Sequence, residues 1–455
     1  MPKTWRILVF AFFLAFWISG CGETSEAPDT PSPEASEESQ TTRLFRPGTT
    51  EETTAAASME REPAPVHGYT YWQPSSNRGV DGTGGLPGSN PVDVRLGGVP
   101  VWVVGVPLGD GTAWVVSLED GRVRAFRLEG SGEISPQPIV PERLPPGAPP
   151  LVEAKDGELE LVVADDRELS ALTHPVPASA GGNLLGITRG GGVLAGGERI
   201  PGVVALPDAR LARSADGAVA ALSKPTARYE HGVLGDGLEA EAMTLLRPAD
   251  EGYRVSGRIR PASGGVFETV APLWSKLNGD DLLAVTESTA AEGSRVSVYD
   301  PDGSLVAAGP FIGAPQKWRH VLAAGPFGPG GETEIAVTRT PHFGPRIEFY
   351  EPNLDEGELR LAAARPGYTS HRIYTRNLDA ARAGDFDGDG RWELLVPDES
   401  YTGLGAIRHE EDGARVAWTL PIGGTLVTNL ASATNWEGRA QVAAGRSDGV
   451  LRIWP

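Results

Sequence analysis

A short apolar strand recurs along this chain from Pro100 onward, at a period of about 55 residues. Each unit has a small-residue approach, a polar turn, the apolar strand, a second strand, a tight turn and a third strand. The apolar strands are centred on Trp114, Leu161, Val219, Leu282, Ile335, Leu394 and Val442. A unit of three or four short antiparallel strands at such a period is typical of a β-propeller blade. This repeat constrains the fold more than any other feature of the sequence.

Turn-forming residues support an all-β fold. The 455 residues include 59 glycines and 39 prolines, and long helices tolerate neither residue well. Asp-Gly pairs stand where tight hairpins need positive φ angles, for example at Asp302-Gly303 and Asp448-Gly449. We therefore predict an all-β chain that forms a β-propeller, because radial repetition protects the strand edges that an open sheet would expose.

The seven apolar strands predict seven blades. Glycine clusters interrupt the pattern between residues 178 and 213, where an eighth, degenerate blade is the alternative. Residues 447–454 end the chain in a strand, and residues 101–106 begin the folded region with another. We expect these terminal strands to pair in one blade and close the ring. Two stacked β-sandwich domains are the alternative fold, which the regular spacing disfavours.

Residues 1–20 are typical of a secretory signal peptide. Lys3 and Arg6 form a short basic start, and residues 7–18 are an unbroken apolar run. A membrane-spanning helix needs roughly 20 apolar residues, so this run is too short for a stable anchor. We therefore predict export of the rest of the chain.

The residues that follow, Ile-Ser-Gly-Cys at 18–21, resemble the lipobox of bacterial lipoproteins. That resemblance implies cleavage before Cys21 and lipidation of its thiol; an incidental cysteine after an ordinary signal peptide is the alternative. Gly22 follows, instead of the aspartate typical of inner-membrane retention, which favours the outer membrane or the cell surface. Cys21 is the single cysteine of the chain, which excludes an internal disulfide and a cysteine-rich metal site.

Residues 21–66 are predicted to be a disordered acidic linker. The segment is dominated by Glu, Ser, Thr, Pro and Ala and cannot bury enough apolar surface to offset its ordering entropy. Its like charges extend it and hold the predicted propeller, residues 67–455, away from the membrane. The whole chain has 60 acidic against 40 basic residues and a formal charge of −20, which argues against nucleic acid as a partner.

One acidic segment carries a pattern typical of a metal site. Asp385, Asp387 and Asp389 alternate along it, and the intervening glycines allow the chain to curl so that these carboxylates converge. The carbonyl of Arg391 falls at the seventh position and Glu393 at the ninth, where each can complete the shell. Hard oxygen ligands in this number suit Ca²⁺. A solvated acidic turn without metal is the alternative.

The segment 384–398, GDFDGDGRWELLVPD, resembles the FG-GAP or VCBS repeats of integrin-α-like propellers, in which a D-x-D-G-D-G loop precedes a strand. Residues 325–339 and 277–286 are similar to the same repeat with most carboxylates lost. The resemblance covers residues 270–455 well, and residues 101–269 only by period. It implies a seven-bladed extracytoplasmic propeller with one structural Ca²⁺ site, which serves as a scaffold that binds proteins or glycans.

No catalytic constellation is recognisable, so we expect no enzyme. The seven histidines are scattered, without an HExxH motif. The alternative is an envelope enzyme, such as a quinone- or sugar-dependent oxidoreductase or a glycan-active enzyme. It would need histidines and arginines that converge on the central channel, for which His231, His342 and His371 are the candidates. A scaffold for outer-membrane protein assembly is a third possibility.

Two polar loops, residues 224–236 and 368–377, carry several functional side chains. Propeller loops cluster on one face, where ligands bind, and Tyr and Arg are frequent at interfaces. We predict a recognition surface formed by Arg228, Tyr229, His231, His371, Arg372 and Tyr374. Inter-blade packing is the alternative role for these residues. The sequence thus favours a lipid-anchored, extracytoplasmic binding or scaffold module for an unknown protein or glycan.

Overall fold

The computed structural model describes residues 66–71, 78–163, 168–178 and 184–455. Over these residues the chain is all-β, as predicted, with strands throughout and a single 3₁₀ turn, η1 (Leu86–Gly88). The described part contains no helix that is long and apolar enough to cross a membrane. The predicted signal peptide, Cys21 and the linker up to residue 65 lie outside the described residues.

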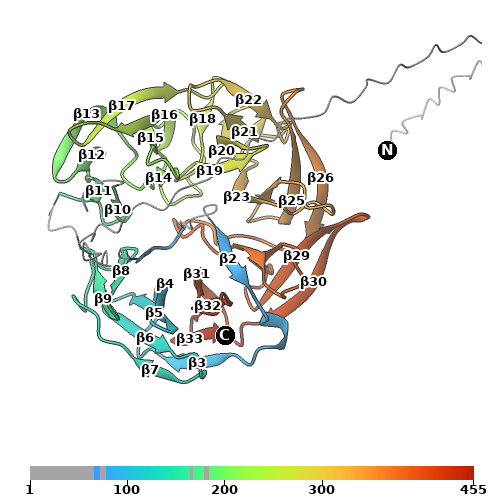
Figure 1. The fold of residues 1–455 in the computed structure, drawn as a ribbon. Helices are drawn as coiled ribbons and strands as arrows, with labels where there is room; N and C mark the ends of the chain where they lie inside the picture. The colour runs from blue at the N-terminus through green and yellow to red at the C-terminus, as the bar shows by residue number, and fades with distance from the viewer. Residues whose placement is uncertain (1–65, 72–77, 164–167, 179–183) are drawn as a thin grey trace, which may run out of the picture. The chain divides into compact units, whose positions relative to one another are not determined.

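Most strands form short antiparallel groups that follow one another in chain order around a common centre (Figure 1). The first group is β4 (Pro100–Leu108), β5 (Gly111–Leu118), β6 (Val123–Leu128) and β7 (Ile134–Pro136). The second is β8 (Val152–Lys155) and β9 (Glu158–Leu161), completed by β1 (Val66–Gly68). The third is β10 (Val176–Pro177), β11 (Leu184–Ile187), β12 (Gly192–Ala195) and β13 (Glu198–Val204).

The next three groups belong to one continuous sheet. The fourth is β14 (Ala212–Arg213), β15 (Val219–Thr226), β16 (Glu239–Pro248) and β17 (Tyr253–Ile259). The fifth is β19 (Leu273–Leu277), β20 (Asp280–Thr289), β21 (Gly293–Tyr299) and β22 (Leu305–Ala308). The sixth is β23 (Arg319–Gly325), β24 (Glu334–Arg339), β25 (Arg346–Asn353) and β26 (Glu358–Pro366). Short pairings join them: β18 (Val266–Phe267) pairs with β16 and β20, and β22 pairs with β26.

The last two groups each take a strand from the N-terminal region. The seventh is β27 (Arg382–Asp385), β28 (Glu393–Pro397), β29 (Gly403–Glu410) and β30 (Gly413–Pro421), extended by β2 (Gly79–Thr83). The eighth is β31 (Leu426–Thr434), β32 (Ala440–Arg446) and β33 (Val450–Trp454), completed by β3 (Val92–Arg95). Val92 pairs with Ile453 and Arg95 with Val450, in antiparallel register.

The repeat predicted from the sequence corresponds to these groups. All seven apolar anchors lie in the second strand of a group, in β5, β9, β15, β20, β24, β28 and β32. The group without an anchor is the third, which lies at the glycine-rich interruption where the degenerate unit was the alternative. Its short strands and the register shift beside Gly192 weaken the pattern, so the anchors count one unit fewer than the eight groups present.

The strand predicted to close the fold needs a correction. Residues 101–106 lie in β4, which begins the first group, and it is β3 that pairs with the C-terminal strand β33. β4 instead packs beside β31, where the Asn429 side chain bonds both the N–H and the C=O of Val103 at 2.9 and 2.8 Å. The chain therefore returns to its beginning one short strand earlier than predicted, because residues 92–95 already satisfy the open edge of β33.

The apolar core lies between consecutive groups. Phe349 of the sixth group packs in one cluster with Leu394 of the seventh, and Leu395 of the seventh packs in another with Trp454 of the eighth. Alternating strand residues thus bury both faces of each group against its neighbours. The loops that connect the strands build the sites described next.

Candidate functional site

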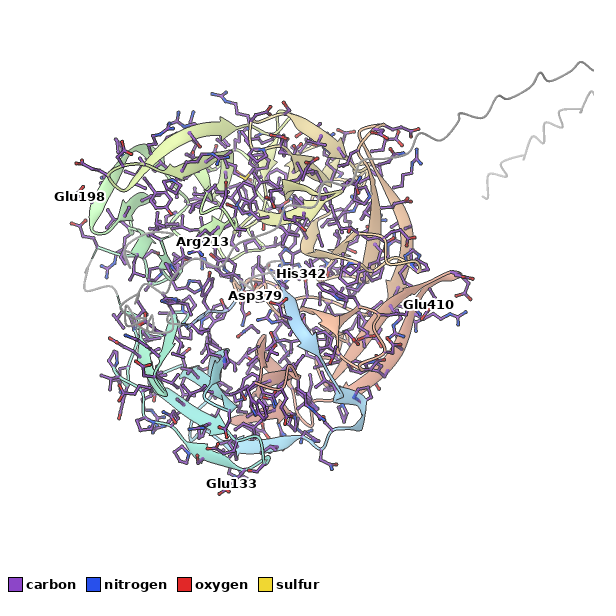
Figure 2. All side chains as sticks on the ribbon, viewed as in Figure 1. Glu133, Glu198, Arg213, His342, Asp379 and Glu410 are labelled. Carbon is purple, nitrogen blue, oxygen red and sulfur yellow. The ribbon has the colours of Figure 1, made fainter. Side chains whose placement is uncertain are left out.

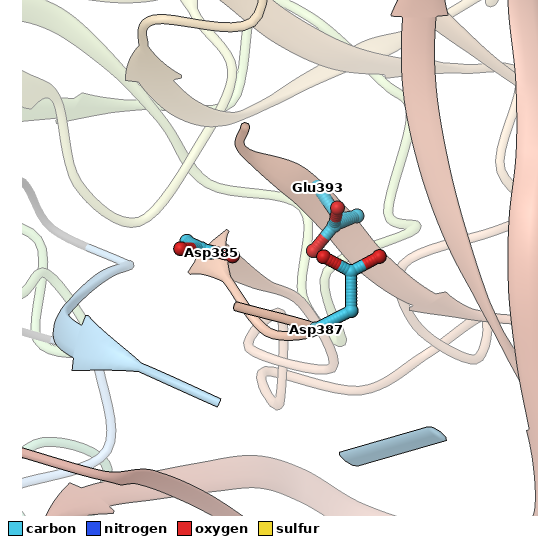
Figure 3. A group of neighbouring side chains, drawn as sticks. All are labelled: Asp385, Asp387 and Glu393. Carbon is cyan, nitrogen blue, oxygen red and sulfur yellow. The ribbon is translucent and has the colours of Figure 1, made fainter. Parts of the chain in front are cut away.

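The acidic loop connects β27 to β28. Oxygen atoms of Asp385, Asp387 and Glu393 lie within 4.8 Å of one another, so these three residues could hold a metal ion (Figure 3). Gly388 and Gly390 have φ angles of 82° and 86°, the left-handed conformation that lets the loop curl as the sequence predicted. The structure therefore brings three of the five predicted ligands together.

Backbone amides hold the carboxylates of the loop in place. The N–H groups of Gly388 and Gly390 donate to Asp385 at 2.8 and 3.1 Å, and that of Phe386 donates to Glu393 at 2.9 Å. Burial raises the pKa of Glu393 to about 7, with Arg408 and the Phe386 amide acting in the opposite direction. These hydrogen bonds fix the positions of the Asp385 and Glu393 carboxylates within the curled loop.

Arg408, which lies on β29 outside the loop, forms hydrogen bonds with carboxylates of the same loop. Its Nη1 lies 2.8 Å from Asp389 Oδ2 and its Nη2 lies 3.0 Å from Asp387 Oδ2, and Nη2 also donates to Glu393. The indole N–H of Trp418 donates to Asp387 as well, at 3.1 Å. A metal ion at this loop would therefore compete with a guanidinium group, a partner that the local motif did not reveal.

The Arg391 side chain, as distinct from the carbonyl predicted as a ligand, is bonded to residues of β29. Its guanidinium group donates to Glu410 at 2.8 Å and to the His409 carbonyl at 3.1 Å. Asp389 binds Arg408 and is not among the three residues whose ligand atoms converge.

A second candidate site is built where the two polar loops meet. The Tyr374 N–H donates to the Val233 carbonyl at 2.9 Å, and Arg376 bonds Asp236 at 2.7 Å, so the loops of residues 224–236 and 368–377 are joined. Beside them is a pocket of about 270 Å³, which we call the histidine pocket. His231, Gln316, Lys317, Thr340 and His342 supply its polar side chains, and Trp318, Phe343 and Ile373 its main apolar ones.

The histidine pocket is rimmed by exposed apolar side chains. Phe343 is 77% exposed and Tyr374, next to Ile373, is 72% exposed, whereas Trp318 at the base is buried. Large apolar side chains with this exposure are unusual on a stable surface and mark sites of contact when they gather around a hollow.

Three residues in or beside the histidine pocket have strained backbone conformations. Gln316 and Thr340, both in the pocket wall, have φ angles of 53° and 47°, and Tyr374 has a φ of 62°. Such angles are uncommon for residues other than glycine, and especially for a β-branched residue such as threonine. Strain of this kind is typical of functional sites, where the surrounding structure holds it.

Imidazole groups cluster around Trp318. The Nε2 atoms of His342 and His371 are 3.1 Å apart, and His371 Nδ1 is 2.9 Å from Ser370 Oγ. Burial lowers the pKa of His342 to about 4, and burial also places the pKa of His371 well below its ordinary value. His231 contacts the carboxylate of Glu268, which is fully buried. The imidazoles of His342 and His371 are therefore neutral at pH 7.

The six predicted recognition residues fall in different places. His231 lines the histidine pocket, His371 lies behind His342, and Tyr374 stands beside the pocket. Arg372 stacks on the ring of Tyr401, with its guanidinium carbon 4.2 Å from the ring centre, at a separate small hollow.

The remaining two predicted residues, Arg228 and Tyr229, line a separate hollow of about 260 Å³ and also make contacts within the fold. Arg228 bonds the carbonyls of Gly264 and Gly265, and Tyr229 is buried edge-on against His231. Trp318 and Phe343 were missed, although an aromatic residue in the loop sequence Pro-His-Phe-Gly-Pro is a signal that could have found Phe343.

A buried charge cluster lies near the centre of the groups, where Figure 2 labels Asp379 and His342, while Glu133 and Glu198 lie at the rim. Asp379 is fully buried and bonds Arg78 at 2.8 Å and Arg210 more closely. Burial opposes ionisation of Asp379, but the arginines outweigh it and lower its pKa. Asp379 therefore remains the anion that compensates these buried cations.

Comparison of the chain with protein-family models and with curated proteins found no match in either case.

Proposed function

We propose that this chain is a lipid-anchored, extracytoplasmic β-propeller of eight blades that binds a ligand at the histidine pocket. The sequential order of the eight groups and the pairing of β3 with β33 support the propeller. The lipobox-like segment ending at Cys21 and the acidic linker support attachment to the cell envelope. The observation that carries the binding role is the strained pocket with Phe343 exposed at its rim.

A glycan is the ligand class that the histidine pocket fits best. Its volume of about 270 Å³ is slightly below the roughly 300–1,000 Å³ of small-molecule sites, which suits one sugar ring. Phe343 offers an apolar face for the ring, while Gln316, Lys317 and Thr340 offer donors and acceptors for its hydroxyls. A protein partner would need roughly 800 Å² of contact per side and would have to extend well beyond the pocket.

Replacing Phe343 with alanine is expected to weaken glycan binding at least about tenfold without lowering the melting temperature, because the side chain is 77% exposed. Binding of soluble chito-oligosaccharides and peptidoglycan fragments is measured by calorimetry. Trp436→Ala is the matched control, since Trp436 is also exposed, at 66%, but lies on the turn between β31 and β32. Equal binding by F343A and wild type, or no binding of any glycan by wild type, would contradict this role and favour a protein partner.

For the acidic loop we propose Ca²⁺ as the ion, because all its candidate ligands are oxygens. Arg408 already bonds three of its carboxylates, so the ion and the guanidinium group compete. The loop would stabilise one blade only, and the binding role does not depend on it.

Replacing Arg408 with glutamine is expected to raise the affinity of the loop for Ca²⁺ at least about tenfold, since the competing cation is removed. Calorimetric titration of chelator-treated protein measures the change. Asp387→Ala should abolish binding in both backgrounds, whereas Arg391→Gln should leave it unchanged because that side chain bonds Glu410. The same Ca²⁺ affinity in R408Q and wild type would show that the guanidinium group does not compete.

An envelope enzyme is the second candidate function. The presence of His231 and His342 in one pocket, with His371 3.1 Å from His342, favours it. However, Arg78 and Arg210 are bonded to Asp379 and do not line the histidine pocket, so they are not available to a substrate there. The binding role is therefore the better supported of the two, and the outer-membrane assembly role has no contact among the described residues in its favour.

A further inference from the structure

Two imidazole nitrogens face each other between the histidine pocket, which His342 lines, and the smaller hollow that His371 lines. His342 comes from the loop after β24 and His371 from the loop between β26 and β27, and their Nε2 atoms are 3.1 Å apart. Two nitrogens bound to one ion at about 2.0–2.1 Å each lie roughly 2.9–3.4 Å apart for bond angles between 90° and 109°. The 3.1 Å separation, at which the two rings share a hydrogen bond, lies within this range, so an ion that replaces the shared proton could bind both nitrogens.

The Nδ1 atoms of His371 and His231 are held by other groups. Ser370 Oγ lies 2.9 Å from His371 Nδ1, which leaves Nε2 as the nitrogen directed at His342. Across the pocket, His231 is held through Nδ1 by Glu268, whose carboxylate also accepts a hydrogen bond from Ser288. Hydrogen bonds of this kind fix the ring orientation of metal-binding histidines and leave Nε2 as the ligand atom.

We propose that His342 and His371 bind a divalent transition-metal ion of the zinc, nickel and copper class, with open coordination positions directed into the histidine pocket. Imidazole nitrogen suits these ions, in contrast to the oxygen donors of the acidic loop. Among the described residues only the acidic loop brings three ligand atoms within 4.8 Å, so the histidine pair supplies two ligands. The other positions are open to water, to a ligand in the pocket or to His231. This site goes beyond the binding role and does not depend on the ligand class.

The test uses Cu²⁺ added to the full chain in detergent after treatment with a chelator. We expect one equivalent to bind, with nitrogen hyperfine splitting in the electron paramagnetic resonance spectrum. The ion should also quench the fluorescence of Trp318, whose ring centre lies 5.2 Å from that of His371 and 6.3 Å from that of His342. The quenched component should be missing in a Trp318→Phe variant that still binds Cu²⁺.

His342→Gln is the decisive variant, because His342 is only partly buried and its loss should not unfold the protein. We expect its Cu²⁺ affinity to fall at least about tenfold and the two-nitrogen signal to disappear, with the melting temperature unchanged. His67→Gln, which removes a histidine paired with Glu153 elsewhere, should bind Cu²⁺ like wild type. The proposal is overturned if H342Q keeps wild-type affinity, or if binding is lost in Asp387→Ala instead, which would place the ion at the acidic loop. Glycan binding by wild type and F343A does not affect the Cu²⁺ measurements. The metal site and the glycan-binding role can therefore be disproved independently.

Discussion

Replacing Asp379 with alanine is expected to lower the free energy of unfolding by about 3–5 kcal/mol, because two buried arginines lose their counter-ion. The Asp379 side chain has no exposure, and those of Arg78 and Arg210 are 8% and 6% exposed. The free energy of unfolding of small domains is roughly 5–15 kcal/mol. A loss of this size therefore leaves much of the protein unfolded. Urea unfolding followed by tryptophan fluorescence measures it.

An exposed ion pair provides the control for this change. Asp110 bonds Arg127 at 2.6 Å, but its side chain is 64% exposed. We expect Asp110→Ala to change the free energy of unfolding by less than about 1 kcal/mol. If D379A also stayed within about 1 kcal/mol of wild type, the arginines would have to be compensated by another group, and Asp379 would not be the anion that holds the centre together.

The sequence predicted the strand repeat well because the second strand is buried along most of its length in every anchored group except the second, where β9 alternates between exposed and buried residues. Trp114, Leu394 and Val442 stand in continuous apolar runs that such strands require. The third group carries no anchor, since β10, β11 and β12 have only two to four residues and β11 and β12 each contain a glycine. The apolar pattern therefore missed a group whose strands are short and interrupted by glycine.

The acidic loop could be predicted from the sequence because its candidate ligands lie close together along the chain. Asp385, Asp387 and Glu393 lie within nine residues, so local spacing alone brings them together. Arg408 and Trp418 belong to later strands, and no spacing rule relates them to the loop. Only the register of β28, β29 and β30 places them over the carboxylates.

The histidine pocket, in contrast, could not be predicted from local spacing in the sequence. Its walls come from several loops that are distant in sequence, among them those of His231, Trp318 and His342. The polar loops of residues 224–236 and 368–377 were recognisable one by one, but their meeting depends on the order of the groups around the centre. The composition of a loop can mark it as functional, whereas the fold decides which loops share a site.

Closure by the N-terminal strands is expected to be essential for folding. A chain that begins at Pro100 lacks β1, β2 and β3, and so leaves open edges on β8, β27 and β33. It also lacks Arg78 and the buried side chains of Val80, Leu86 and Leu96. Burial of each of these apolar side chains contributes roughly 1.5–3 kcal/mol, so together they approach the whole stability of a typical domain. We expect this chain to show no cooperative melting transition in calorimetry.

Two matched variants separate closure from a general effect of shortening. A chain that begins at Glu62 keeps β1 to β3, and it should melt like the full chain. Leu86→Ala keeps every strand but removes a side chain that is fully buried against the seventh and eighth groups, and it should lower the free energy of unfolding by about 2–5 kcal/mol. Cooperative melting of the chain from Pro100 at the wild-type temperature would mean that the groups are stable without closure. In the closed propeller that we propose, each group depends on both neighbours, so the loss of one short strand such as β3 is expected to disturb the loops that build the histidine pocket.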